Sequence, residues 1–254
     1  MKDLKIPYTR SLVYVLLALL IVVSCKAHKN KNTLIEKGEV ETHTKHSEEE
    51  WITLFDGSSF NNWRGYLSDR VYPEWTIEEG AMAFTPGKEG EKNIITKEKF
   101  SSFILSLEWK ISEGGNSGVF WGIFEDEAFP KPYETGPEIQ VLDNERHPDA
   151  KVNPRYHQAG ALYDLVQPTQ DACKPAGEWN EYIIKVDHKS NSGSVTLNGV
   201  LITEFPVHGE EWDALVAQSK FKNWKGFGKY KTGHIGLQDH SDKVWYRNIK
   251  IKKL

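Results

Sequence analysis

Short segments of alternating apolar and polar residues limit what this chain can fold into more than any other feature of its sequence. In residues 103–111, apolar side chains such as Phe103, Leu105 and Leu107 stand at every second position. That period is typical of a strand with one buried face. Similar short runs occur at residues 81–84, 119–124, 138–142, 182–186, 194–197, 235–238 and 244–251. The chain is therefore predicted to be rich in β-strands.

The connections between these runs favour antiparallel pairing. Asn198-Gly199 lies between two β-rich segments and suits the positive φ angles of a type I′ turn, so residues 194–203 are predicted to form a hairpin. Residues 210–220 show some helical spacing, and one short helix is expected there. Many short strands without a βαβ alternation predict an all-β fold, an antiparallel sandwich or jelly roll. Because no internal repeat of fixed period is present, residues 51–254 are expected to form one domain.

Residues 1–24 have the parts of an export signal. Basic residues precede an apolar run at residues 12–23, and a small residue precedes Cys25. As a helix, this run would cover ~18 Å, well short of the ~30 Å hydrocarbon core of a bilayer. Residues 22–25, Val-Val-Ser-Cys, resemble the lipobox of bacterial lipoproteins. The resemblance implies export and a lipid anchor at Cys25 in the bacterial cell envelope. The periplasmic face of the outer membrane is the expected location, and the cell surface is the alternative.

Composition separates a polar tether from the folded part. Residues 25–50 contain no aromatic residue and are expected to form a flexible tether, whereas the whole chain has 9 Trp, 10 Tyr and 11 Phe to build a core. With 32 basic and 36 acidic side chains, the chain lacks the basic excess that phosphate binding needs, so no nucleic-acid partner is expected. If Cys25 carries lipid, Cys173 has no partner for a disulfide.

Seven short motifs follow one another along residues 51–252. They are WITLFDG at 51–57, GNSGV at 115–119, EIQVLD at 138–143, GALY at 160–163, GEWN at 177–180, GHIGLQDH at 233–240 and RNI at 247–249. Together they resemble the 3-keto-disaccharide hydrolase family, also described as 3-keto-glucoside 1,2-lyase/3-keto-2-hydroxyglucal hydratase. The resemblance implies a concanavalin-like sandwich whose substrate is a glycoside or disaccharide already oxidised at C3. No nucleotide cofactor is expected.

Glu138 and Gln140 are the first candidate site residues. Alternation in this segment places Ile139 and Val141 on one face and Glu138 and Gln140 on the other. If the apolar pair packs into the sandwich, Glu138 faces outward as a candidate catalytic carboxylate, and Gln140 lies beside it as a candidate substrate-binding residue. The alternative is a solvated glutamate on an exposed strand face.

Two histidines are candidates for proton transfer and for metal binding. Gln238 and His240 follow a short apolar segment, which places a substrate-binding amide and a catalytic imidazole near the end of a strand. Histidine can take a proton near neutral pH or bind a divalent metal as the neutral base. His157, in a proline-containing loop, is a further candidate for substrate or metal binding, and its alternative is a purely structural role.

The remaining substrate-binding candidates are polar or aromatic. Asn116 begins a polar segment before an apolar strand and can present its amide to sugar hydroxyls. Tyr163, like Tyr133 and Trp121, offers a flat surface on which a pyranose ring can stack. Arg247 either binds a substrate oxygen or forms an ion pair.

These candidates are consistent with an elimination mechanism. A ketone at C3 acidifies the C2 hydrogen, so a base can form an enolate that expels the group at C1, and water then rehydrates the product. We expect Glu138 and His240 to share the proton transfers. A divalent metal ion held by some of Glu138, His157 and His240, or failing that Arg247 or Asn116, is expected to stabilise the enolate.

Two other functions are compatible with the same pattern. A retaining glycosidase needs two carboxylates about 5 to 5.5 Å apart, but the residue two positions after Glu138 is Gln140, an amide that cannot act as nucleophile. A non-catalytic carbohydrate-binding module would use the same concave sheet and aromatic side chains for binding alone.

Overall fold

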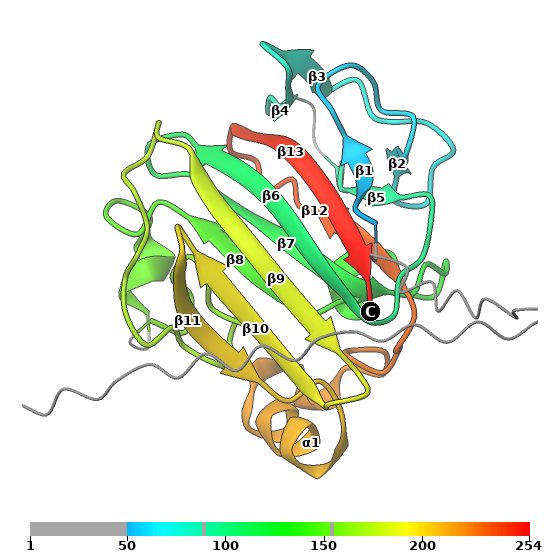
Figure 1. Cartoon of the computed structure of the whole chain (residues 1–254), viewed down its shortest axis with the longest axis vertical. Helices are drawn as coiled ribbons and strands as arrows, with labels where there is room; N and C mark the ends of the chain where they lie inside the picture. The colour runs from blue at the N-terminus through cyan, green and yellow to red at the C-terminus, as the bar shows by residue number, and fades with distance from the viewer. Residues whose placement is uncertain (1–49, 88–89, 153–154) are drawn as a thin grey trace, which may run out of the picture. The chain divides into compact units, whose positions relative to one another are not determined.

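The computed structural model describes residues 50–87, 90–152 and 155–254. These residues form two antiparallel sheets that pack face to face (Figure 1). The predicted export signal, the lipidation site Cys25 and all of the predicted tether except Glu50 lie outside the described residues. In the part of the chain that is described, no helix is both long and apolar enough to cross a membrane.

The larger sheet has eight strands. They are β1 (Ile52–Phe55), β3 (Trp75–Glu78), β4 (Ala81–Phe84), β6 (Phe103–Ile111), β9 (Asn180–Asp187), β10 (Ser192–Leu197), β11 (Val200–Phe205) and β13 (Val244–Lys253). Seven of them neighbour one another in the order β11-β10-β9-β6-β13-β4-β3, and β1 pairs with the C-terminal part of β13. The last strand of the chain therefore lies near the middle of this sheet, paired with three others.

The smaller sheet has five strands and carries the candidate residues. They are β2 (Trp63–Gly65), β5 (Ile94–Thr96), β7 (Asn116–Ile123), β8 (Glu138–Leu142) and β12 (His234–Leu237). Their order is β2-β5-β12-β7-β8. In the β7–β8 pair, Phe120 stands opposite Glu138 and Gly118 opposite Gln140, so these four residues share one face of the sheet.

Helical segments are few and short. They are α1 (Gly209–Gln218) and the 3₁₀ turns η1 (Pro132–Glu134), η2 (Pro148–Lys151) and η3 (Lys220–Asn223). Trp212 of α1 is buried, with its ring centroid 6.0 Å from that of Trp121 and 6.3 Å from that of Phe227. Trp212, with the partly buried Leu215 and Val216, attaches α1 to the core and brings the following η3 turn close to the smaller sheet.

Two buried tyrosines link the sheets by hydrogen bonds. The hydroxyl of Tyr246, from β13, lies 2.8 Å from the hydroxyl of Ser117 on β7. The hydroxyl of Tyr182, from β9, donates to the backbone carbonyl of Gln140 on β8 at 2.6 Å. A buried hydroxyl needs such a partner, because leaving it unpaired costs about 1 to 3 kcal/mol. These bonds therefore help to fix β7 and β8 against the larger sheet.

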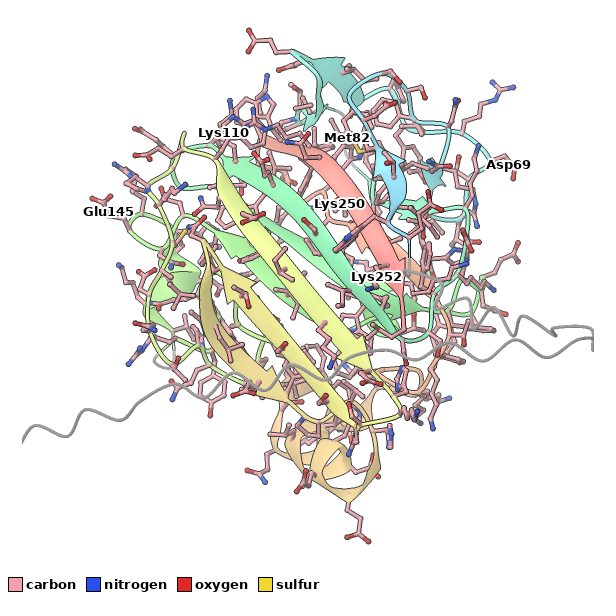
Figure 2. All side chains as sticks on the ribbon, in the orientation of Figure 1. Asp69, Met82, Lys110, Glu145, Lys250 and Lys252 are labelled. Atoms are coloured by element: carbon pink, nitrogen blue, oxygen red, sulfur yellow. The ribbon has the colours of Figure 1, made fainter. Side chains whose placement is uncertain are left out.

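The outer face of the larger sheet is solvated and charged. Figure 2 shows Lys110 on β6 and Lys250 and Lys252 on β13 along this face. The ammonium of Lys110 lies 4.4 Å from the ring centroid of Trp245 and 5.0 Å from that of Trp179. Cations thus cover the tryptophan rings of this face.

The structure confirms the all-β antiparallel sandwich and contains a strand at every segment where one was predicted. Asn198 and Gly199 have φ angles of +51° and +81°, as the predicted hairpin between β10 and β11 requires. The expected helix is α1. Four strands were not predicted, β1, β2, β3 and β5. Each has only three or four residues, too few for a clear period of two.

Candidate active site

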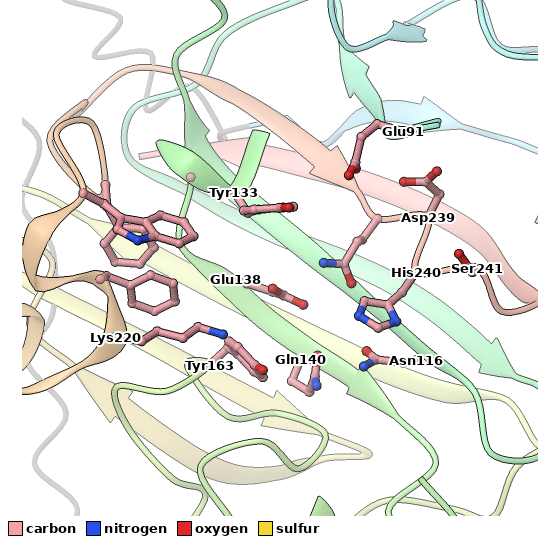
Figure 3. Close-up of a pocket in the computed structure, with 15 residues that line it drawn as sticks. Glu91, Asn116, Tyr133, Glu138, Gln140, Tyr163, Lys220, Asp239, His240 and Ser241 are labelled. Atoms are coloured by element: carbon pink, nitrogen blue, oxygen red, sulfur yellow. The ribbon is translucent and has the colours of Figure 1, made fainter. Parts of the chain in front are cut away.

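A cavity of about 490 Å³ lies on the face of the smaller sheet that points away from the larger one. This volume is within the ~300 to 1,000 Å³ typical of small-molecule sites. Figure 3 shows the side chains that line it. They come from the strands β7 and β8, from the residues after β12, from η1, from η3 and the residues that follow it, and from three loops. The set includes Asn116, Tyr133, Glu138, Gln140, Tyr163, Lys220, Phe221, Trp224, Phe227, Gln238, Asp239 and His240.

Glu138 occupies the middle of the cavity. As predicted, Ile139 and Val141 pack into the core, and Glu138 and Gln140 point to the other face. The carboxyl of Glu138 lies over Gly118, where any Cβ would stand only 2.7 Å from the Glu138 Cδ atom. Removal of the carboxyl from water raises the pKa of Glu138 to about 8, although the nearby Lys220 ammonium lowers it. Glu138 is therefore a carboxyl that keeps its proton near neutral pH.

Three buried amides surround one end of the cavity. Asn116, Gln140 and Gln238 are each no more than 7% exposed, and each has a side-chain oxygen that is buried without a hydrogen-bond partner. Gln140 uses its Nε2 to donate to the backbone carbonyl of His157 at 3.3 Å, which leaves its oxygen directed elsewhere. Unpaired buried acceptors are costly unless a ligand satisfies them. A ligand that carries hydroxyl groups can supply the donors that these oxygens lack.

Asp239 and His240 leave the end of β12 beside these amides. Burial is the main cause that raises the pKa of Asp239 to about 7. The charge of Glu91 contributes to this rise, and the backbone N–H of Lys92, which donates to the carboxyl, opposes it. His240 is exposed, so its imidazole can reach a bound ligand. Ser241, which follows it, has a φ angle of +62°, a left-handed conformation that turns the chain sharply after His240.

Lys220 is the only lysine or arginine among the side chains that line the described cavity. It begins η3, where its backbone N–H donates to the Asp164 carboxyl at 2.8 Å. Its ammonium lies 4.1 Å from the ring centroid of Tyr163, and the Tyr163 hydroxyl donates to Asp149 at 3.1 Å. Lys220 therefore brings a positive charge close to Glu138.

Aromatic rings form the end of the cavity around Lys220. Trp224 is partly exposed, and its ring centroid lies 5.9 Å from that of Tyr133 and 5.0 Å from that of Phe221. Phe221 stacks on Phe227 with centroids 3.9 Å apart. The two phenylalanines are buried and support Trp224, whose ring keeps part of its surface free.

His157 was expected to bind substrate or metal, but it does not line the cavity. It is 8% exposed and stacks on Tyr163 with centroids 4.3 Å apart. Its Nε2 lies 3.1 Å from Asp164 and its Nδ1 3.3 Å from Asp149. Because both ring nitrogens face aspartates, His157 positions Tyr163 from behind instead of contacting a ligand in the cavity.

The predicted metal ligands therefore do not converge. Glu138 and His240 line the cavity, but His157 does not. Across residues 50–87, 90–152 and 155–254, no group of three or more His, Cys, Asp or Glu side chains is arranged to hold a metal ion. This geometry does not fit the expected ligand set of Glu138, His157 and His240, and no step of the reaction is assigned to a metal.

Arg247 and Trp121 also lie away from the cavity. Arg247 is on the outer face of the larger sheet, where its Nη2 pairs with Glu108 at 2.6 Å and its guanidinium stacks on Trp179. Of the two roles expected for Arg247, the structure shows the ion pair and not substrate binding, since alternation along β13 directs its neighbour Tyr246 inward and Arg247 outward. Trp121 is 4% exposed and packs in the core.

Sequence reasoning missed Lys220 and the aromatic end. Residues 220–227 read KFKNWKGF, with aromatic residues at every third position between lysines. That spacing was a usable signal of an unusual surface segment. Because residues 220–227 are far from β8 along the chain, the sequence did not indicate that this segment lies beside Glu138.

The fold and the cavity together define a β-sandwich with a candidate ligand site on the outer face of its smaller sheet. Residues 50–252 match the 3-keto-alpha-glucoside-1,2-lyase-like domain family. A protein of Bacteroides thetaiotaomicron named 3-keto-disaccharide hydrolase is 38% identical over 231 residues, which cover 80% of this chain and 78% of that protein. The chain therefore belongs to the 3-keto-alpha-glucoside-1,2-lyase-like family.

Two crystal structures from Parabacteroides distasonis, both provisionally named glycosyl hydrolases, share this fold. One is 27% identical with a TM-score of 0.74 and covers 81% of this chain and 95% of that one. The other is 28% identical with a TM-score of 0.62 and covers 81% of this chain and all of that one.

Proposed function

We propose that the protein cleaves glycosides or disaccharides that carry a ketone at C3, by elimination followed by hydration. Family membership and the name of the Bacteroides relative support this class of substrate. The observation that carries the proposal is the position of Glu138, a carboxyl with a pKa of about 8 in the middle of a cavity lined by amides and a histidine. A group that keeps its proton near neutral pH can give it to a leaving oxygen.

The elimination step needs a base, an acid and a group that stabilises the enolate. The C3 ketone acidifies the C2 hydrogen, and the imidazole of His240 takes that proton. Glu138 gives its proton to the oxygen that leaves C1, so the C1–O bond breaks as the C1–C2 double bond forms. The carboxamide of Asn116 donates to the C3 oxygen while it carries negative charge.

The hydration step returns both residues to their starting states. Water adds at C1 and gives a proton to the Glu138 carboxylate, while the imidazolium of His240 returns a proton to C2. One water is consumed and two sugars, or a sugar and an aglycone, are released, which is net hydrolysis. The amides of Gln140 and Gln238 bind ring hydroxyls in both steps.

The proposal is tested by turnover of a purified 3-keto-glucoside by the wild type, Glu138→Gln and His240→Ala. Loss of an acid or a base typically lowers the rate by about 100-fold or more, and we expect both variants to lose this much. Wild-type rates in both variants would contradict the assignment. Assays with and without EDTA test the metal prediction separately, and we expect the same rate in both.

A carbohydrate-binding module is the second candidate, because amides and a partly exposed tryptophan also serve binding alone. Calorimetry with unoxidised disaccharides distinguishes the two functions. Binding of these sugars by a protein that turns over no 3-keto-glycoside would favour the module.

A further inference from the structure

The two ends of the cavity differ in chemistry, and we propose that they bind the two parts of the substrate separately. The 3-keto ring occupies the amide end, and the leaving group occupies a subsite formed by Trp224, Tyr133, Phe221 and Lys220. This inference rests on the proposed function. It adds an orientation for the substrate and a requirement on the leaving group.

The amide end is suited to the oxidised ring. Three buried side-chain oxygens without partners, from Asn116, Gln140 and Gln238, converge there with His240. A ring with a carbonyl and several hydroxyls supplies donors to these oxygens and accepts from the amide N–H groups. His240, the proposed base, belongs to this end, so the C2 hydrogen must also lie here.

The opposite end offers a surface for stacking. The indole of Trp224 contacts the rings of Tyr133 and Phe221 and remains partly exposed. The ammonium of Lys220 lies 5.3 Å from the ring centroid of Phe221 and can donate to hydroxyls of a neighbouring ring. An exposed indole next to a hydrogen-bond donor suits a ring that has an apolar face and a polar edge.

Glu138 stands at the boundary between the ends. Figure 3 shows its carboxyl between Lys220 on one side and His240 on the other. An acid at this position protonates the oxygen that joins the two halves of the substrate. With the keto ring held at the amide end, the C1 substituent extends past Glu138 towards Trp224.

This arrangement identifies the substrates as 3-keto-glucosides whose leaving group is a ring with an apolar face. A second pyranose and an aryl group both meet that requirement. A methyl group is too small to reach Trp224 from the C1 oxygen, and it gains nothing from the aromatic end.

The test measures kcat/KM for three 3-keto-glucosides, with glucosyl, p-nitrophenyl and methyl leaving groups, in the wild type, Trp224→Ala and Trp224→Phe. We expect Trp224→Ala to lose about tenfold on the ring-bearing substrates and less than about twofold on the methyl glucoside, because only the former lose a stacking contact. Trp224→Phe should lose less. The matched control is Trp51→Ala, since Trp51 is 40% exposed and lies outside the cavity.

The pattern across substrates separates the outcomes. A selective loss on the disaccharide alone, or on the aryl glucoside alone, supports the subsite and identifies the kind of ring that it binds. An equal loss on all three substrates, or no loss with either ring, would overturn the subsite while the proposed function stands. A wild type that converts none of the three would overturn the proposed function and the subsite with it.

Discussion

At the scale of single residues, the site depends on how a carboxyl on a strand is kept away from water. Burial away from water raises the pKa of Glu138, and the positive charge of Lys220 lowers it. A carboxyl whose pKa lies near the working pH is both protonated often enough to act as an acid and acidic enough to give up its proton. The pair therefore predicts the pH dependence of the reaction.

We expect kcat/KM to fall as the pH rises through about 8, because Glu138 must be protonated to act on the leaving oxygen. In Lys220→Met the fall should move to higher pH, since removing the ammonium removes a charge that stabilises the carboxylate and lowers its pKa. Activity measured from pH 5 to 10 checks this. The control is Lys222→Met, an exposed lysine of η3 outside the cavity, which should leave the profile unchanged. A shift of the Lys220→Met profile to lower pH would contradict the assignment.

Gly118 makes room for the same carboxyl. A Cβ at this position would lie 2.7 Å from Cδ and 2.8 Å from Cγ of Glu138, so Gly118→Ala must push the side chain aside. A displacement of ~1 Å can cost about 100-fold in rate, and we expect a loss of that order in kcat. Circular dichroism should show that the sandwich remains folded. A folded variant with wild-type kcat would show that the position of Glu138 is not critical.

At the scale of elements, short turns determine which strands meet and which side chains share a face. The β10–β11 hairpin was predicted from two residues, because Asn-Gly adopts positive φ at little cost. The strands β2 and β5 have three residues each and were not predicted. They form because they pair with neighbouring strands, and their own residues show no clear alternation. A local signal thus identified this hairpin, whereas pairing with strands distant in the sequence determined β2 and β5.

The hairpin turn gives a test that is independent of the active site. Gly199 has a φ angle of +81° and open space around its Cα, so Gly199→Ala introduces backbone strain without a clash. We expect a loss of about 1 kcal/mol in the free energy of unfolding, measured by urea denaturation, with unchanged kcat/KM. An increase in stability would show that the turn does not impose the strain inferred here.

At the scale of the whole molecule, we propose that Cys25 carries lipid and holds the domain at the cell envelope. The basic start, the apolar run and the Val-Val-Ser-Cys sequence support this proposal. Such an anchor would place the reaction on the exported side of the membrane, where the domain meets sugars released outside the cytoplasm.

Cys25→Ala tests the anchor. We expect the wild-type protein to fractionate with membranes and to incorporate labelled fatty acid. The Cys25→Ala variant should do neither, because the lipid is attached through a thioether bond to the cysteine sulfur. The matched control is Cys173→Ala, since Cys173 lies in the folded part and should leave fractionation unchanged. Fatty-acid incorporation by Cys25→Ala would refute the proposal.

The sequence by itself determined most of the strands, the sandwich and the outward direction of Glu138 and Gln140, because a period of two assigns each side chain to a face. It also placed Gln238 and His240 at the end of a strand. Only the tertiary structure decided which outward residues share one cavity. Arg247 alternates outward on the wrong sheet, His157 lies behind Tyr163, and Lys220 and Trp224 reach Glu138 through the docking of α1. Packing between segments that are distant in the sequence determines which side chains share the cavity, and alternation within a single segment carries no information about that packing.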